Sequence, residues 1–316
     1  MLLNLVLHLF NSLLWASIVE RLNPKLTLTA GCLFAAHPMA TDAVASVAGR
    51  SALLAGFVLF SGLLTAFYWP KLGLIGGFVL LILSMGMMPS AWFSIEGLTS
   101  TWEHIPRFIS ALGSYVFPRL FAPLYLTADP DIVYSGLALC LGMAVLLVAS
   151  QVILVTHSPA LRWGLAMAVL PLLPYALVPL PDVFFDHRAY IALAGSSLLM
   201  AYVFSKVPRG AIVLVCAFMV LTYQRVSVYA TPIALWEDAV SKAPYKFRPH
   251  INLAHAYGQM NRADDTEREL RAALQIDPNS PIALRNLAAV LLFKGDAQGA
   301  YEIFQTHAET IGKLIE

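Results

Sequence analysis

Charged residues are scarce in this sequence. Of its 316 residues, 12% are Asp, Glu, Lys or Arg, whereas soluble domains average about 25%. Hydrophobic residues make up 59%, and the mean hydropathy is +0.70. The net charge is only +1 and no basic run stands out, so nothing in the composition indicates nucleic-acid binding. This composition is typical of a membrane protein, for which membrane lipids are the first expected partner.

Cysteine-based sites and common catalytic motifs are also missing. Cys32, Cys140 and Cys216 each lie in an apolar stretch and lack metal-ligand spacing, so they are expected to be small buried hydrophobes without a disulfide framework. The sequence has no Gly-rich phosphate loop, no His-x-x-x-His pair and no Gly-x-Ser-x-Gly elbow. No metal site is predicted, although a requirement for a divalent metal stays open.

The charged residues that are present are unevenly distributed. Residues 1–225 contain 19 of them and residues 226–316 contain the other 20. A long apolar region is therefore followed by a short one of ordinary soluble composition. We predict a transmembrane domain over 1–228 and a water-soluble domain over 229–316.

Apolar stretches divide the first domain into membrane spans. A span needs about 20 apolar residues, which predicts an all-α bundle of about eight spans. The segment 103–126 is amphipathic and contains three prolines, so we expect it to lie in the interface or to re-enter the membrane. The predicted spans are 2–19, 26–43, 51–69, 72–90, 133–155, 161–180, 189–205 and 210–228.

The loops between these spans predict an orientation. Basic residues in very short loops face the cytoplasm in most membrane proteins, and one set of alternating loops carries six cations and one acid. These residues are Glu20, Arg21, Lys25, Lys71, Arg162, Lys206 and Arg209. All other acids of the region lie in the opposite set, so that set and the C-terminal domain are expected outside the cytoplasm. That corresponds to a bacterial periplasm or to the lumen of the endoplasmic reticulum.

The soluble domain contains an internal repeat. Asn252-Leu253-Ala254 recurs 34 residues later as Asn286-Leu287-Ala288, and the turn residue Asn261 recurs as Gly295. A 34-residue period is typical of tetratricopeptide repeats, which predicts about two and a half repeats stacked as a helical solenoid. Either a peptide-binding surface or a structural cap fits this pattern.

Two polar clusters interrupt the apolar domain, and both lie on the predicted outer side. The first is His37-Pro38-Met39-Ala40-Thr41-Asp42, followed by Arg50. Pro38 is expected to end or kink the helix before it. If the chain then resumes as helix, Asp42, Ser46 and Arg50 share one face. Asp42 can then hold Arg50 or act as a base, and His37 can donate to a phosphate; the alternative is an interfacial helix whose charges face water.

The second cluster is Asp186-His187-Arg188-Ala189-Tyr190, directly before a predicted span. The guanidinium of Arg188 suits a lipid phosphate, because it forms bidentate hydrogen bonds. Asp186 can orient His187 or Arg188. The alternative is a set of interface anchors, with Arg188 snorkelling and Tyr190 in the aromatic belt. Two further acids, Asp129 and Asp131, are weak candidates for metal or substrate contact, and we expect them instead in a solvated turn.

Together with the repeats, these clusters resemble a known family, the transmembrane-and-tetratricopeptide proteins, which include protein O-mannosyltransferases and bacterial relatives. Family members carry Leu-Phe-Ala-x-His-Pro-x-x-Thr-Glu-Ala-Val and then Gly-Arg. This chain has Leu33-Phe34-Ala35-Ala36-His37-Pro38-Met39-Ala40-Thr41-Asp42-Ala43-Val44 and then Gly49-Arg50. Asp186-His187-Arg188-Ala189-Tyr190 is similar to the family's Glu-His-Arg-x-Tyr motif, and Leu235-Trp236-Glu237-Asp238 is similar to the entry into its repeats.

The resemblance implies a GT-C-type glycosyltransferase. Such an enzyme transfers a sugar from a polyprenyl-phosphate donor to a protein or glycan acceptor on the outer face. In this chain it implies Asp42 and His37 as catalytic residues. It implies a donor-phosphate and substrate site formed by Arg50, Asp186, His187, Arg188 and Tyr190.

One difference from the family leaves two functions open. The segment beginning at Met1 resembles the family's second span, so the first span and its acidic outer loop are not found in this sequence. The first function is the glycosyltransferase. The second is a catalytically inactive, glycosyltransferase-like scaffold whose repeats dock a partner protein in a larger membrane complex.

Overall fold

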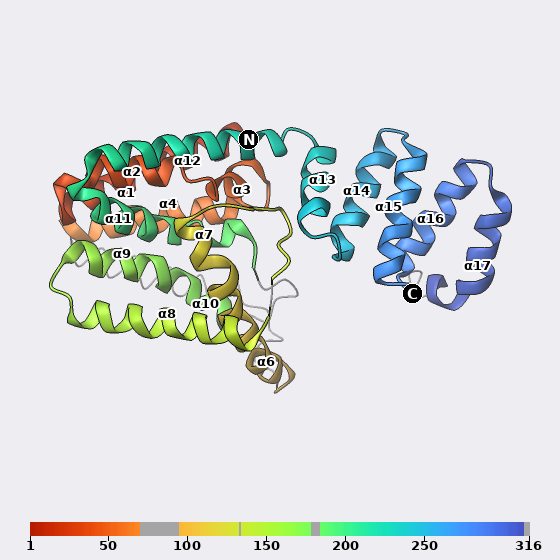
Figure 1. Ribbon diagram of the computed structural model, residues 1–316, viewed down its shortest axis with the longest axis horizontal. Coiled ribbons are helices and arrows are strands. Elements are labelled where there is room, and N and C mark those ends of the chain that lie inside the picture. The colour runs from red at the N-terminus through yellow and green to blue at the C-terminus, as the bar shows by residue number, and fades with distance from the viewer. Residues whose placement is uncertain (70–94, 133, 178–183, 313–316) are drawn as a thin grey trace. The chain divides into compact units, whose positions relative to one another are not determined.

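The computed structural model describes residues 1–69, 95–132, 134–177 and 184–312, and every regular element in these ranges is helical (Figure 1). The all-α fold class is thereby confirmed for the described residues. Contacts along the chain divide it into two compact units. The first, called the bundle here, comprises Met1–Leu126 and Ile132–Val226. The second, called the tail, comprises Thr127–Asp131 and Ser227–Glu316.

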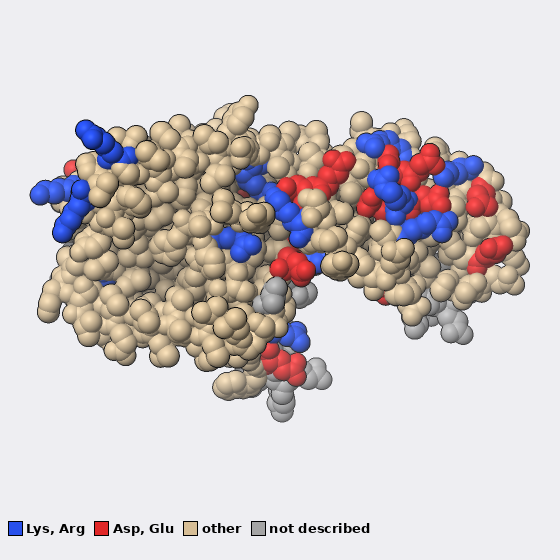
Figure 2. Space-filling model, in the orientation of Figure 1, with Lys and Arg blue, Asp and Glu red and all other residues tan. Residues whose placement is uncertain are grey.

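The bundle is built from long helices and short helical segments. Among the described residues, five helices are long and apolar enough to cross a membrane: Leu2–Leu22, Arg50–Tyr68, Gly136–Val155, Pro159–Leu177 and Pro208–Val228. These correspond to α1 (Leu2–Leu22), α4 (Arg50–Tyr68), α8 (Gly136–Val155), α9 with η4 and α10 (Pro159–Val169, Leu170–Leu172, Leu173–Leu177) and α12 (Pro208–Val228). Most of the bundle surface seen in Figure 2 carries no charged side chain.

Shorter elements fill the intervals between the long helices. They are η1 (Pro24–Leu26), α2 (Thr27–Ala35), α3 (Ala40–Ala45), α6 (Ile95–Ala111), the π-helical turn η3 (Leu112–Val116), α7 (Phe117–Phe121), η5 (Asp186–Ala189), α11 (Ala192–Val203) and η6 (Phe204–Lys206). The predicted interfacial segment 103–126 is therefore helical from its start to Phe121, and Pro106 lies inside α6.

Two of the predicted spans differ from the observed helices. The segment 26–43 is not one continuous helix, because α2 ends at Ala35 and the chain turns around Pro38 before α3 begins. The segment 189–205 contains the 12-residue α11, which at about 1.5 Å per residue is too short to cross a bilayer unaided. The predicted span 72–90 lies outside the described residues.

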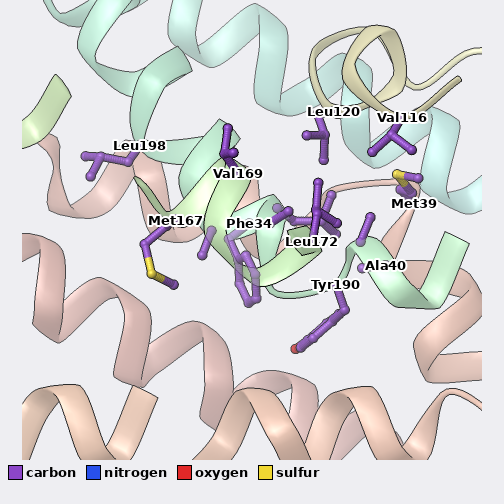
Figure 3. Close-up of a cluster of buried hydrophobic side chains, with 14 of the residues drawn as sticks. Phe34, Met39, Ala40, Val116, Leu120, Met167, Val169, Leu172, Tyr190 and Leu198 are labelled. Atoms are coloured by element: carbon purple, nitrogen blue, oxygen red, sulfur yellow. The ribbon is translucent and has the colours of Figure 1, made fainter. Parts of the chain in front are cut away.

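Aromatic side chains join distant parts of the bundle core. The ring of Phe34 lies 5.4 Å from that of Tyr190 and 5.8 Å from that of Phe60, which in turn lies 5.7 Å from Trp15. All four side chains are almost completely buried. Figure 3 shows Phe34 and Tyr190 in this apolar cluster. Helix α11 packs along α2 and α9, and it places the second polar cluster beside the first.

In the described part of the tail, α13 (Pro232–Lys242) is followed by two antiparallel helix pairs, α14 (Phe247–Gln259) with α15 (Ala263–Ile276) and α16 (Pro281–Phe293) with α17 (Ala297–Gly312). The starts of α14 and α16 are 34 residues apart, and so are the starts of α15 and α17. Each pair turns at a residue with positive φ, Asn261 at 57° and Gly295 at 87°. These residues occupy equivalent positions of the repeat and adopt the left-handed conformation that ends many helices.

A short segment from the middle of the sequence belongs to the tail. Asp129 has only 2% of its side chain exposed and forms an ion pair with Lys246, while Arg248 lies 3.7 Å from its other carboxylate oxygen. The expectation that Asp129 lies in a solvated turn is therefore wrong. Its carboxylate fixes the segment Thr127–Asp131 to the loop before α14.

Candidate functional site

The two polar clusters predicted from the sequence meet in the bundle. Asp42 is in α3 and His187 is in η5, 145 residues later. Oδ2 of Asp42 accepts a hydrogen bond from the backbone N–H of His187 at 3.0 Å and from its ring Nδ1 at 2.8 Å. The two side chains are 12% and 18% exposed. The pair is thus largely, but not completely, shielded from solvent.

The backbone between Asp42 and Arg50 places these two residues on different helices. Helix α3 has only six residues and ends at Ala45, because Ser46 is extended. The prediction that Asp42, Ser46 and Arg50 share one helical face is therefore wrong. Arg50 instead begins α4, and its Nε donates to Oδ1 of Asn4 at 3.1 Å.

The imidazole of His187 is held in a defined orientation. Its ring stacks on Phe185 at 5.6 Å with an interplanar angle of 11°. Because Asp42 accepts from Nδ1, the neutral ring carries its proton there and its lone pair on Nε2. Among the described residues, none forms a hydrogen bond to Nε2. This nitrogen can therefore accept a proton.

A second carboxylate, Asp186, is buried beside this pair. Its side chain is 2% exposed, and its Oδ1 accepts a hydrogen bond from the hydroxyl of Tyr115 at 2.8 Å. Burial, followed by the negative charge of Asp42, raises the pKa of Asp186 to about 7, although the positive charges of Arg225 and Arg119 oppose this rise. A buried carboxyl group with a raised pKa is common in acid–base sites.

Cations surround Asp186. The guanidinium of Arg119 lies 3.8 Å from the centre of the Tyr115 ring, and Arg225 in α12 is 6% exposed. The guanidinium of Arg188 lies 5.1 Å from the Phe185 ring and 5.7 Å from the Tyr175 ring. The charges of Arg119 and Arg225 act on Asp186, and positive charge of this kind can stabilise a phosphate.

Two of the predicted site residues have their polar groups bonded to other parts of the bundle. His37 is fully buried; its Nδ1 accepts from the N–H of Met39 and its Nε2 faces the carbonyl of Leu120 at 3.2 Å. Tyr190 is 1% exposed, and its hydroxyl lies 2.8 Å from Nδ1 of His8. These contacts connect elements of the bundle core.

Tyr115, Arg119, Arg225 and the polar face of α1 were not selected from the sequence as site residues. Asn4, His8 and Asn11 recur at intervals of four and three, which places them on one face of α1. All three are buried and bond to other elements of the bundle. Arg225 is a cation in the last turn of a long, mostly apolar helix, which was a usable signal. Nothing in the sequence linked Tyr115 to Asp186.

Searches of protein-family models, curated proteins and solved structures found no match to this chain. The described residues also contain no group of three or more His, Cys, Asp or Glu side chains arranged to hold a metal ion.

Proposed function

We propose that the bundle is a membrane glycosyltransferase that moves a sugar from a polyprenyl-phosphate donor to a hydroxyl group of a protein or glycan. The observation that carries this proposal is the hydrogen-bonded pair of Asp42 and His187. Both residues come from motifs that resemble those of the GT-C-type family, and the fold brings them together from 145 residues apart.

In the proposed reaction His187 is the general base and Asp42 is the residue that positions it. Nε2 of His187 takes the proton of the acceptor hydroxyl as the acceptor oxygen forms a bond to the anomeric carbon of the sugar. The bond between that carbon and the donor phosphate breaks, and the lipid phosphate leaves with the electron pair. The carboxylate of Asp42 stabilises the imidazolium that forms, because it accepts the hydrogen bond from Nδ1.

The neighbouring cations suit the leaving phosphate. Arg188 is adjacent in sequence to His187, and Arg119 and Arg225 are near enough to Asp186 for their charges to oppose the rise in its pKa. Cations positioned where negative charge develops are a large source of transition-state stabilisation. Asp186 has a pKa near 7, and its carboxyl group partly neutralises these positive charges when it is ionised but not when it is protonated.

The proposal is tested by reconstituting the full chain in liposomes with polyprenyl-phosphate mannose or polyprenyl-phosphate glucose and with peptides containing Ser and Thr. We expect sugar transfer by the wild type and at least a 100-fold loss in His187→Gln, since general acid–base catalysis contributes about 10²–10⁴-fold. Asp131→Asn in the tail is the matched control and should leave the rate unchanged. Transfer by His187→Gln at the wild-type rate would contradict the assignment.

A catalytically inactive scaffold is the second candidate function. It is favoured by His37 and Tyr190, whose polar groups bond to the bundle itself. In this case the tail, whose paired helices repeat every 34 residues, acts as a tetratricopeptide solenoid that docks a partner protein. Purification from native membranes separates the two functions: a stable complex that depends on the tail and shows no transfer supports the scaffold.

The enzyme proposal also requires that α3 and the tail lie outside the cytoplasm, as the charges of the short loops indicate. This orientation is tested in a cysteine-free variant with one new cysteine at Tyr245, which is 84% exposed. A membrane-impermeant thiol reagent should label this cysteine in intact cells or sealed vesicles of the appropriate orientation. Labelling only after the membrane is opened would contradict the outer placement.

A further inference from the structure

An apolar cavity of about 480 Å³ opens in the wall of the bundle. It lies between the start of α1, the end of α12 and the segment that contains α2 and α3. Leu2, Leu5, Val44 and Val226 supply much of its lining. Three of these side chains, Leu2, Leu5 and Val226, are also strongly exposed, at 77%, 45% and 50%.

One buried polar atom in the wall of this cavity has no hydrogen-bond partner among the described residues. Thr41 lines the cavity and is 4% exposed, and its Oγ1 has no hydrogen-bond partner among the described residues. A buried hydroxyl is nearly always hydrogen-bonded, so an isolated one calls for a ligand or a bound water. The other polar side chains of the lining do have partners. Thr222 donates to the carbonyl of Ala36, His37 is hydrogen-bonded to Leu120 and Met39, and His8 is hydrogen-bonded to Tyr190 and Ala35.

The chemistry of the cavity defines its occupant. Its walls are nearly all apolar, and water needs two to four polar partners to be held in such a space. A hydrocarbon chain fills it better, provided that the chain carries one hydrogen-bond acceptor at the level of Thr41. Helices α1 and α12 are long and apolar enough to cross a membrane, so the exposed lining faces lipid when they do.

We propose that this cavity binds one acyl chain of a bilayer phospholipid, whose ester carbonyl accepts a hydrogen bond from the hydroxyl of Thr41. The ester group of a phospholipid lies between the hydrocarbon core and the headgroups. Thr41 lies at a similar boundary between apolar and polar surroundings. It lines the apolar cavity, and the next residue in α3 is Asp42, which belongs to the polar pair. This site is separate from the proposed transfer reaction and does not depend on it.

The test uses the full chain in liposomes that contain a diacyl phosphatidylethanolamine with a photoactivatable group in its acyl chain. We expect cross-links on the segments 1–8 and 35–45 after irradiation. Ala45→Trp and Val226→Trp each fill the cavity from a different wall and should lower this labelling at least fivefold. Leu147→Trp, on the exposed face of α8, is the matched control and should not change it.

A second comparison tests the hydrogen bond from Thr41. A diether analogue of the lipid lacks the ester carbonyl, so the wild type should retain the diester several-fold better than the diether, as measured by competition. Thr41→Val should abolish this preference. Equal labelling in Ala45→Trp and the wild type, no preference for the ester, or displacement of the label by polyprenyl phosphate but not by unlabelled phospholipid would each overturn the proposal.

Discussion

The bundle and the tail use their polar residues in opposite ways. In the bundle, polar side chains join residues far apart in sequence: 145 positions separate Asp42 from His187 and 182 separate His8 from Tyr190. In the tail, many ion pairs are local, such as Arg262 with Asp265 at three positions apart. Figure 2 shows both signs of charge mixed on the visible face of the tail. A polar residue in the apolar bundle therefore carries more information on tertiary structure than most charged residues of the tail do, although Asp129 and Glu269 also bond to distant parts of the tail.

The glycines of the bundle and those of the tail also have different roles. In the bundle, a Cβ added at Gly195 would lie 2.1 Å from the backbone nitrogen of Ala168, and one added at Gly142 would lie 2.1 Å from the carbonyl oxygen of Ile109. These glycines let helices approach closely, as small residues do in membrane proteins. In the tail, Gly295 instead provides a left-handed turn between two helices.

The largest effect is expected from Gly195→Ala. The added methyl group meets the backbone of α9, which cannot move aside as a flexible side chain could. We expect a loss of more than about 3 kcal/mol of stability, the upper part of the range for overpacking, or failure to fold. Thermal unfolding of the detergent-solubilised protein measures this. Gly62→Ala is the control, because nothing lies within 4 Å of its added Cβ. Equal unfolding temperatures in the two variants would contradict the close contact between Gly195 and α9.

Asp186→Asn should change the pH dependence of stability. The pKa of Asp186 is raised to about 7 in the folded chain from an ordinary value of 3.8. Between these two pKa values the folded state keeps a proton that the unfolded state loses. The contribution of Asp186 to the free energy of unfolding is therefore fully present below about pH 4, and it is lost as the pH rises to about 7.

The effect is on the order of 4 kcal/mol, since each of the roughly three pH units between the two pKa values corresponds to about 1.4 kcal/mol. Unfolding temperatures measured between pH 4 and 8 should therefore fall less in Asp186→Asn than in the wild type. Parallel curves for the two proteins would show that Asp186 is ionised throughout this range.

A smaller effect is expected for His250→Gln in the tail. Nδ1 of His250 bonds to Glu269 at 2.8 Å and Nε2 to the carbonyl of Pro244 at 3.0 Å, which connects α14, α15 and the loop before α14. The bond with Glu269 raises the pKa of His250 and lowers that of Glu269. The contribution of His250 is lost as the pH rises through its raised pKa, and that of Glu269 as the pH falls through its lowered pKa.

The pair should therefore stabilise the tail most between about pH 4.5 and 6.5. We expect His250→Gln to cost about 1–3 kcal/mol, measured as faster hydrogen exchange in α14 and α15 of the full chain. Unchanged exchange in these helices at pH 6 would show that the pair contributes nothing to stability.

The smallest effect is expected for Gly295→Ala. An alanine in the left-handed conformation costs roughly 1–2 kcal/mol, and exchange should increase in α16 and α17 only. Gly258→Ala is the control, because its added Cβ meets only ordinary contacts at 3.8 Å and the helical position favours alanine. If both variants have the same effect, the turn does not need the left-handed residue.

The difference between local contacts in the tail and long-range contacts in the bundle explains how much could be predicted from the sequence. The helical pairs of the tail follow from a 34-residue repeat, and the long apolar helices follow from local hydrophobicity. The partner of Asp42 was not predicted, because it depends on how α11 packs against α2. The length of the apolar stretch did not predict the length of the helix at 26–43 and 189–205. Each stretch is long enough to cross a membrane, but the helices that form there are shorter. The link between Tyr115 and Asp186 had no local signal at all.

The central claim is that the fold couples Asp42 and His187 into one functional unit. A double-mutant cycle of sugar transfer tests it most directly, with Asp42→Asn, His187→Gln and the double variant compared in liposomes. Residues that act as a unit have non-additive effects, so the double variant should be no slower than the slower single variant. A double variant that is slower by the product of the two single effects would contradict the account.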